Sequence, residues 1–271
     1  MKLDAQDRKP KIKERIDRVG VEGLRTHLKI VRQNVEFSHL PSIDVMIDLP
    51  SDKKGIHMSR LIESINETVS QKTEGIKESL EEFGNEILKE ILKRHPYKRG
   101  EITIRTTLIL NKITPVSGRT TNEPYDVIIK VMRDNGRPLK YLEIKAIGNT
   151  LCPHSLEITG GKSHIQRAEL QLGLLTDLET DVTLEKMIEI CEGCFSSPTF
   201  TVLKSEDEKF IVEKMFSNPK FVEDLTRECF DEVINLSIKG KVKIRAVSYE
   251  SIHKHNAVSE IEREINGGLD V

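Results

Sequence analysis

Pairs of strand-like segments and pairs of helix-like segments occur in both halves of the sequence, and this order constrains the fold more than any other feature. Alternating apolar or β-branched residues predict strands over 28–37, 42–50, 101–110, 125–134, 139–148, 167–177, 199–204 and 241–250. Apolar residues on one helical face predict two helices between 59 and 96, a third over about 183–195 and a helical stretch over about 206–235. The order indicates an α+β fold with antiparallel sheets, helices packed on one face and two similar modules.

The two early helices are defined by stripes of apolar residues that predict core faces. The first stripe begins at Leu61 and lies behind a predicted capping residue, Ser59. The second stripe runs from Ile76 to Leu92 and ends before Pro96, which cannot continue a helix.

Two modules of ordinary size fit the length of the chain. Residues 1–26 are charged and loosely patterned, so they are expected to form an N-terminal arm. The first module is expected over 27–134, opening on a hairpin of its first two strands, and the second over 135–271. Asn135-Gly136 predicts a tight hairpin between two later strands.

The nearly equal numbers of basic and acidic side chains exclude a protein that binds polyanions through its overall electrostatic potential. The 271 residues include 42 basic and 44 acidic side chains, for a net charge of −2, so neither nucleic acid nor a membrane is an expected partner. No apolar run approaches the ~20 residues that cross a bilayer, and a cytoplasmic location is expected. In that compartment the four cysteines are expected to be thiols, buried or metal-bound.

The stretch 152–167 contains two side chains that suit a metal ion. Cys152 follows one predicted strand and His164 precedes the next, so antiparallel pairing of the strands would bring both to one end. Taken alone, a cytosolic cysteine such as Cys152 is usually a small buried apolar residue, and a histidine such as His164 is more often a surface residue than a ligand. Lys162 and Arg167 flank the histidine and suit phosphate groups, or simply a solvated surface.

Three further residues suit a metal site by type. Glu208 lies three residues after Ser205, a spacing typical of a capping box at a helix start, and its carboxylate is also a possible ligand. His253 and His255 follow the last predicted strand. On an extended segment a His-x-His pair points both rings to one side, whereas an exposed polar tail explains the pair equally well.

Glu223 lies early in a helix that Asn218 is expected to cap and Pro219 to open. The helix dipole favours a carboxylate there, so a solvated helix face is the default interpretation. In a pocket, the same carboxylate would accept two parallel hydrogen bonds from the N1–H and 2-amino edge of a guanine.

The segment GIHMSR at 55–60 joins a strand to a helix. Its free N–H groups beside Arg60 form a possible anion site, although plain helix capping explains Ser59 as well. Cys191 and Cys194 form a single Cys-x-x-Cys pair without a second pair, and they are interpreted as structural.

Five motifs in this order resemble the GTP cyclohydrolases of the tunnelling-fold superfamily, in the group that contains the bacterial type IB and archaeal MptA enzymes. The motifs are VGVEGLRTHLKI, KGIHMSR, CPHSLEITGGKSHIQRA, LKSEDEKFIVEKMFSNPKFVED and SYESIHKHNA, and they span nearly the whole chain. The resemblance implies two tandem tunnelling-fold (T-fold) modules, with the metal ligands in the second. It also implies a homo-oligomer, expected to be a tetramer, with active sites at subunit interfaces.

The resemblance also implies roles for single residues. The implied metal ligands are Cys152, His164, Glu208 and His253, and the implied guanine anchor is Glu223. Fe(II) is the favoured ion, with Mn(II) and Zn(II) as the other possibilities. The implied catalytic residues are Cys152, His154, His57 and His255, with the three histidines as unranked proton shuttles. Phosphate binding is expected from Arg60, Lys162 and Arg167.

The implied reaction opens the guanine ring of GTP at C8 and releases formate. The bacterial enzymes have Cys-Pro-Cys-Ser where this chain has His154 at the third position, and HIQRA replaces HNQRS. These differences favour the archaeal-type product, 7,8-dihydroneopterin 2′,3′-cyclic phosphate. The alternatives are a bacterial-type enzyme that yields 7,8-dihydroneopterin triphosphate, and a purine- or pterin-binding T-fold protein without catalytic activity.

Overall fold

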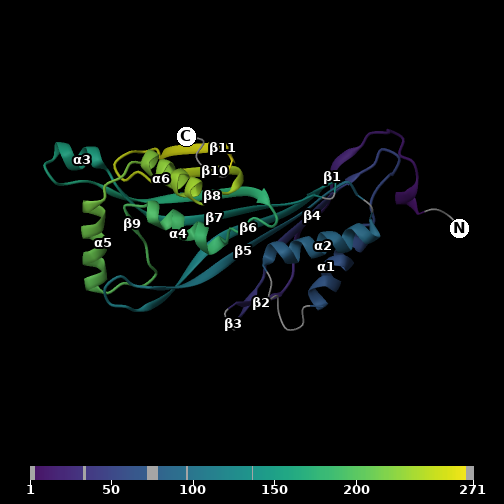
Figure 1. The fold of residues 1–271 in the computed structure, drawn as a ribbon, viewed down its shortest axis with the longest axis horizontal. Coiled ribbons are helices and arrows are strands. Elements are labelled where there is room, and N and C mark those ends of the chain that lie inside the picture. Colours follow the sequence, from purple (N-terminus) through teal and green to yellow (C-terminus); the bar gives the residue numbers. More distant parts are fainter. Residues whose placement is uncertain (1–3, 33–34, 72–78, 96, 136, 267–271) are drawn as a thin grey trace. The chain divides into compact units, whose positions relative to one another are not determined.

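The computed structural model describes residues 4–32, 35–71, 79–95, 97–135 and 137–266 (Figure 1). The chain divides into two compact units. Unit 1 contains Met1–Thr106 and Ile128–Tyr141, and unit 2 contains Thr107–Val127 and Leu142–Val271. The unit boundaries therefore fall inside strands and differ from the predicted modules, 27–134 and 135–271.

Unit 1 combines a sheet with two helices, and its strands follow the order β1-β4-β5-β6-β7. Its elements are a 3-10 helix η1 (Ala5–Asp7), β1 (Ile16–Arg25), β2 (Leu28–Arg32), β3 (Val35–His39), β4 (Ser42–Leu49), α1 (Met58–Gln71) and α2 (Leu80–Arg94), with parts of β5 (Arg99–Ile113), β6 (Thr120–Asp134) and β7 (Arg137–Leu151). Helices α1 and α2 pack on each other and bury most of the predicted stripes. Ile62 and Val69 are half-buried, Leu92 is exposed, and Ile76 lies outside the described residues.

Strand β1 occupies part of the segment that was predicted to be an arm, so that prediction is wrong for Ile16–Arg25. The strand pairs antiparallel with β4, and two register shifts interrupt the pairing. These irregularities remove the period-two pattern by which a strand is recognised in sequence. Gly20 is required by this contact, because a Cβ there would lie 1.8 Å from the carbonyl oxygen of Val45.

The predicted opening hairpin is also different in the structure. Segment 28–37 is not one strand: β2 and β3 pair with each other in a separate two-stranded sheet. Strand β4 instead lies between β1 and β5. The later predicted hairpin turn includes Gly136, which lies outside the described residues, but Asn135 has the positive φ of 52° that such turns require.

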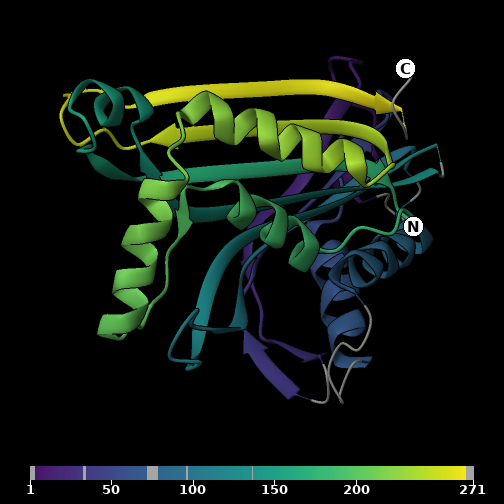
Figure 2. The same cartoon turned by 60° about the vertical axis from the view of Figure 1, so that its left-hand side comes forward.

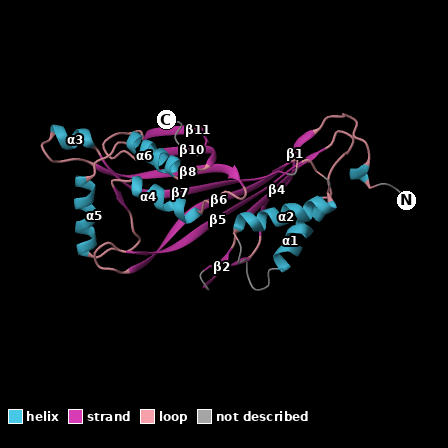
Figure 3. Ribbon diagram, in the orientation of Figure 1, coloured by secondary structure: helices cyan, strands magenta, loops and turns pink. Residues whose placement is uncertain are grey.

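Unit 2 contains the rest of the sheet, in the order β5-β6-β7-β8-β10-β11, with β9 paired to β7 (Figure 3). Its own elements are α3 (Pro153–Ile158), β8 (Ile165–Asp177), α4 (Leu184–Cys194), β9 (Ser197–Pro198), α5 (Ser205–Ser217), α6 (Val222–Asn235), β10 (Lys239–Ser248) and β11 (Ala257–Asn266). The predicted alternation in β8 is confirmed, since Ala168, Leu170, Leu172 and Leu174 are fully buried. Helices α4 and α6 cover one face of these strands (Figure 2).

Two further predictions are wrong in unit 2. Residues 199–204 form a loop after the short β9, because the N–H of Thr201 donates to the Glu123 carboxylate at 2.8 Å instead of to a strand. The helical stretch 206–235 contains the expected second helix, α6, but this helix begins at Val222 and not at Pro219. Two further elements, α3 and β11, were not predicted from the sequence. None of the described helices is long and apolar enough to span a membrane.

The pairing in unit 2 brings several strand ends together. Ser248, the last residue of β10, pairs with Ala168 on one side and with Ala257 of β11 on the other. The N–H of Cys152, just after β7, donates to the carbonyl of His164 at 3.3 Å. The loops 152–164 and 249–256 therefore meet at the same end of the sheet.

Candidate functional site

A pocket of about 290 Å³ lies at this end of the unit 2 sheet. It is lined by Cys152, His164, Gln166, Lys220, Phe221, Val222, Glu223, Ser248, Glu250, His253, His255 and Ala257. Five residues singled out in the sequence are thus brought together from loops and a helix more than a hundred positions apart: Cys152, His164, Glu223, His253 and His255.

Cys152 is held at the junction of β7 and α3. It is the N-cap of α3, its Sγ accepts a hydrogen bond from the N–H of Ser155 at 3.4 Å, and Pro153 opens the helix. The Cys152 carbonyl accepts a hydrogen bond from the Ser163 hydroxyl at 2.7 Å. These contacts fix the sulfur at the pocket wall, where an N–H donor faces it as suits a metal-bound thiolate.

His164 is oriented by a chain of side-chain hydrogen bonds. Its Nδ1 lies 2.8 Å from Oε1 of Gln166, whose Nε2 donates to the hydroxyl of Thr150 at 3.2 Å. Because the amide oxygen accepts, this contact favours the tautomer that carries the proton on Nδ1 and presents Nε2 to a ligand. This is the arrangement that outer hydrogen bonds impose on metal-binding histidines.

Glu250 lines the pocket but was not predicted from the sequence to be a site residue. Its side chain is 12% exposed, Oε1 accepts the Ser248 hydroxyl at 2.9 Å, and Oε2 lies 4.0 Å from Nδ1 of His164. Its position at the end of the last predicted strand, 241–250, was the available signal, because residues at converging strand ends gather at one edge. Lys220 was also missed, but its ammonium donates to the Cys194 carbonyl at 2.9 Å and pairs with Glu228.

His253 and His255 stack on each other, with ring centroids 5.1 Å apart and planes 14° apart. Both rings therefore lie on one side of their segment, although bends rather than a strand carry them. Glu223 lies in the first turn of α6 and is exposed at the pocket. Asn218 does not cap this helix as predicted: it ends α5, and its side-chain amide donates to the carbonyl of Phe195 at 3.2 Å.

Glu208 does not line the pocket, and the capping box predicted for it is wrong. Helix α5 has Lys204 at its N-cap, and the residue that bonds back to the N-cap N–H is Asp207, at 3.0 Å. Asp207 is fully buried, while Glu208 is exposed on the next position of the helix. Ligation of a metal by Glu208 stays a prediction.

The remaining predicted residues lie elsewhere. His154, Lys162 and Arg167 are exposed in unit 2 and do not line the pocket. His57 and Arg60 belong to unit 1, where the N–H of Arg60 donates to the His57 carbonyl in the first turn of α1. That helix begins at Met58, so Ser59 is not its cap.

The pocket's side chains fit a borderline divalent metal by chemistry. One thiol, imidazoles and carboxylates are the donors that Fe(II), Mn(II) and Zn(II) share. Their donor atoms are not gathered within 4.8 Å of one another, since the group of described residues that meets this distance is Asp4, Asp7 and His57 of unit 1. An ion in the pocket would therefore require these side chains to turn toward it.

Comparison with known proteins decides the family. The family model described as type I GTP cyclohydrolase folE2 matches residues 3–259. This chain belongs to that family. Membership makes it a GTP cyclohydrolase by class, and it confirms the resemblance found in the sequence. The match includes both units and every residue that lines the pocket.

Relatives within the family include archaeal and bacterial proteins. The GTP cyclohydrolase MptA of Pyrococcus furiosus is 45% identical over 96% of this chain and 99% of its own length. That of Thermococcus kodakarensis is 44% identical over the same shares. The GTP cyclohydrolase FolE2 of Nitratidesulfovibrio vulgaris is 30% identical over 98% of this chain and 99% of its own.

A solved structure supports the fold of this cyclohydrolase-family chain. Uricase from Arthrobacter globiformis superposes with a TM-score of 0.58 over 94% of this chain and 96% of its own, at 8% sequence identity. At that identity the similarity concerns the fold alone. It confirms the predicted α+β class, in which helices pack on one face of a largely antiparallel sheet.

Proposed function

We propose that this GTP cyclohydrolase forms 7,8-dihydroneopterin 2′,3′-cyclic phosphate. The observation that carries the proposal is the unit 2 pocket, where a thiol, imidazoles and the half-buried Glu250 lie beside Glu223. Two facts support the cyclic product over a triphosphate. His154 stands where bacterial enzymes have a cysteine, and three MptA relatives share 44–45% identity, whereas FolE2 relatives share 30–33% and other MptA relatives 29–32%.

A divalent metal in this pocket is part of the proposal, with Fe(II) favoured over Mn(II) and Zn(II). The proposed donors are Cys152, His164 and His253, with Glu250 or Glu208 as the carboxylate. When bound, such an ion acidifies a water molecule toward a pKa of about 7, so that hydroxide is available for addition to guanine C8. Gln166 supports this role because it keeps the lone pair of His164 Nε2 free.

The guanine base would be selected by Glu223. Its carboxylate accepts two parallel hydrogen bonds from N1–H and the 2-amino group, whereas adenine offers no such pair. His255 stacks on His253 at the pocket and is the proposed donor of the proton that N7 gains when hydroxide adds at C8 and the N7=C8 double bond becomes single. His57, His154 and Cys152 stay candidates for the later proton transfers.

The later steps balance without an oxidant or reductant. Hydrolysis of the formyl group releases formate, and the sugar carbons rearrange and close the dihydropterin ring with loss of water. Attack of the 2′-hydroxyl on the α-phosphorus then forms the cyclic phosphate and expels diphosphate. Arg60, Lys162 and Arg167 are the proposed phosphate-binding side chains.

A homo-oligomer is also proposed, with active sites at subunit interfaces and a tetramer as the expected state. The exposed apolar residues around the pocket support a covered surface there, among them Phe221 at 44% and Ile252 at 61% exposure. Light scattering of the purified protein measures the assembly mass against the 30.9 kDa of one chain.

Product analysis tests the proposed reaction. The protein is incubated anaerobically with GTP and Fe(II), and products are separated by chromatography with mass detection. We expect formate, diphosphate and the cyclic phosphate. A triphosphate product without diphosphate would overturn the cyclic assignment, and unchanged GTP in the presence of bound metal would overturn the catalytic proposal.

Matched variants test the residue roles. Glu223→Gln removes the charged acceptor and should lower kcat/KM for GTP by about 10–100-fold, whereas Glu213→Gln, an exposed glutamate of α5, should not. The amount of bound metal is measured in the Glu250→Gln and Glu208→Gln proteins and compared. Loss of metal in only one of them identifies the carboxylate ligand.

A further inference from the structure

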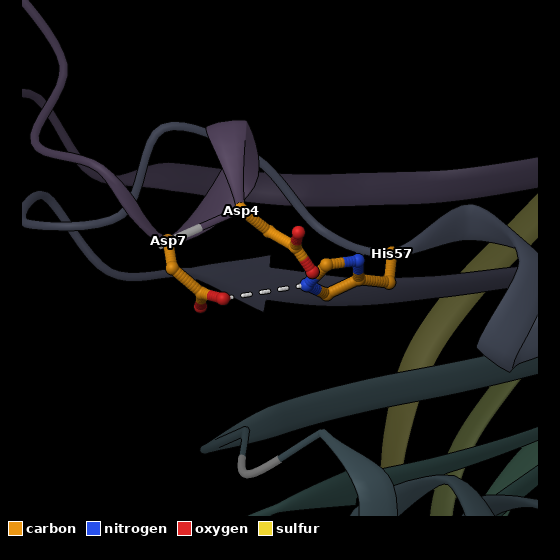
Figure 4. A group of neighbouring side chains, drawn as sticks. All are labelled: Asp4, Asp7 and His57. Atoms are coloured by element: carbon orange, nitrogen blue, oxygen red, sulfur yellow. Dashed lines mark ion pairs between the residues drawn. The ribbon is translucent and has the colours of Figure 1, made fainter. Parts of the chain in front are cut away.

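A second group of potential metal ligands lies in unit 1, apart from the residues of the pocket. Asp4, Asp7 and His57 each bring one donor atom to within 4.8 Å of the others (Figure 4). Among the residues that the structure describes, no other set of three such donors is equally close. The two carboxylates come from the N-terminal segment, and the imidazole comes from the loop before α1.

Local backbone structure places the two carboxylates together. η1 is a 3-10 helix with three residues per turn, so Asp4 at its N-cap and Asp7 at its last position point to the same side. The Asp4 side chain makes no capping hydrogen bond. It is therefore held at this place without a structural task in the helix.

Backbone hydrogen bonds fasten this segment to the loop that carries the imidazole. The N–H of Lys54 donates to the carbonyls of Gln6 at 3.1 Å and Arg8 at 2.9 Å, and the N–H of Gly55 donates to Gln6 at 3.2 Å. The group is thus assembled by main-chain contacts, so it does not depend on flexible side chains meeting by chance.

The histidine at this group has a buried nitrogen that pairs with Asp7 at a distance longer than a hydrogen bond. His57 Nε2 is buried and has no hydrogen-bond partner. It lies 3.6 Å from Oδ2 of Asp7, beyond hydrogen-bond range. Two ligands about 2.1 Å from a tetrahedral ion are about 3.4 Å apart, so the spacing suits a shared ion better than a direct bond.

A second unsatisfied imidazole lies next to the first. His95 is 9% exposed, its Nε2 is buried without a partner, and its ring centroid is 6.1 Å from that of His57. Buried polar groups without partners are rare and costly in native proteins. Finding two together indicates that this place is built around a ligand.

The net charge of the group favours the binding of a cation. Lys53 donates to Oδ1 of Asp7 at 2.9 Å, which leaves Oδ2 and the Asp4 carboxylate available. Two carboxylates against one ammonium give a net negative charge at a partly exposed place. Oxygen ligands and a single imidazole suit Mn(II), Fe(II) or Zn(II) better than a soft ion.

We propose that Asp4, Asp7 and His57 bind a divalent cation of the Mn(II), Fe(II) or Zn(II) class, which ties the N-terminal segment to the loop before α1. This site shares no residue with the pocket of unit 2. It therefore does not depend on the proposed catalytic metal, and the two can be counted separately.

Mn(II) binding to the full chain tests the site, with electron paramagnetic resonance to count bound ions. Metal-stripped Cys152→Ala protein, in which the pocket has lost its thiolate, should still bind a Mn(II) ion. Adding Asp4→Asn should weaken that binding at least tenfold, since a ligand is lost while no capping bond is broken. Asp52→Asn is the matched control, because it removes an exposed charge from the same loop without removing a ligand.

The outcomes separate the two sites. Retained binding in Cys152→Ala and Cys152→Ala/Asp52→Asn, with loss in Cys152→Ala/Asp4→Asn, supports the proposal even when the catalytic proposal fails. Equal Mn(II) affinity in the Asp4→Asn and Asp52→Asn proteins would overturn it. Circular dichroism of each metal-free variant establishes that the fold is retained, and His57→Ala should show the same loss as Asp4→Asn.

Discussion

The carboxylate of Asp207 joins the start of α5 to the loop between β5 and β6. Burial alone would raise the pKa of Asp207, but bonds from the Ser117 hydroxyl at 2.6 Å and from the N–H groups of Ser117, Lys204 and Val116 outweigh it. The pKa of Asp207 is therefore held well below its usual range. The charged form is the one that the fold stabilises.

This lowered pKa predicts how stability depends on pH. Because the folded pKa lies below the unfolded value of about 3.9, the stabilisation is complete above that value and is lost as pH falls toward the folded pKa. Asp207→Asn should thus lower the free energy of unfolding at pH 7, and the difference from wild type should shrink below about pH 4. Denaturant unfolding across pH measures this, with exposed Asp231→Asn as the control. A difference that stays constant with pH would contradict it.

The same place shows where residue-level prediction reaches its limit. The spacing of Ser205 and Glu208 predicts a capping box, whereas Lys204 and Asp207, one residue earlier, occupy the two positions. Asp207 takes the capping position because Ser117, about ninety positions away, donates a hydrogen bond to it. A local sequence pattern contains no information about such a distant partner. Cys152 and His164 were found because the pairing of neighbouring strands is a local matter.

At the scale of elements, β7, β9 and the end of α4 meet at Gly148, where the close packing leaves no room for a side chain. A Cβ on Gly148 would lie 2.2 Å from the buried ring of Phe195, the residue after α4. Gly148→Ala should therefore destabilise the protein by about 1–3 kcal/mol through overpacking. Gly193→Ala in α4 meets nothing within 4 Å and should instead stabilise it by up to about 1 kcal/mol. Denaturant unfolding compares the two, and equal effects of both variants would refute the packing argument.

Elements with a clean pattern were predictable and irregular ones were not. The alternation in β8 and the stripe in α2 predicted their buried faces because one side of each meets the core. Strand β1 was missed because bulges shift its register, and β11 because as the last strand in the order it buries little apolar surface. Segment 199–204 has the composition of a strand, yet tertiary hydrogen bonds to Glu123 hold it as a loop.

For the whole molecule, the two proposed cation sites predict a metal-dependent melting temperature. An ion at a hundredfold excess over its dissociation constant contributes about 2.7 kcal/mol. In a chain of this size that corresponds to roughly 5–10 °C per site. Calorimetry with chelator and with Mn(II) measures the shift. It should be smaller in Cys152→Ala and in Asp4→Asn, and absent in the double variant. A full shift in the double variant would contradict both sites.

Strands β5, β6 and β7, of 15 residues each, take the chain out of unit 1 at Thr106, back into it at Ile128 and out again at Tyr141. On the ribosome, neither unit can therefore be completed before the third of these strands has emerged. A nascent chain that ends at residue 106 exposes β5 without its next neighbour in the sheet. The gene consequently offers no single cut point that would yield two separately expressible halves.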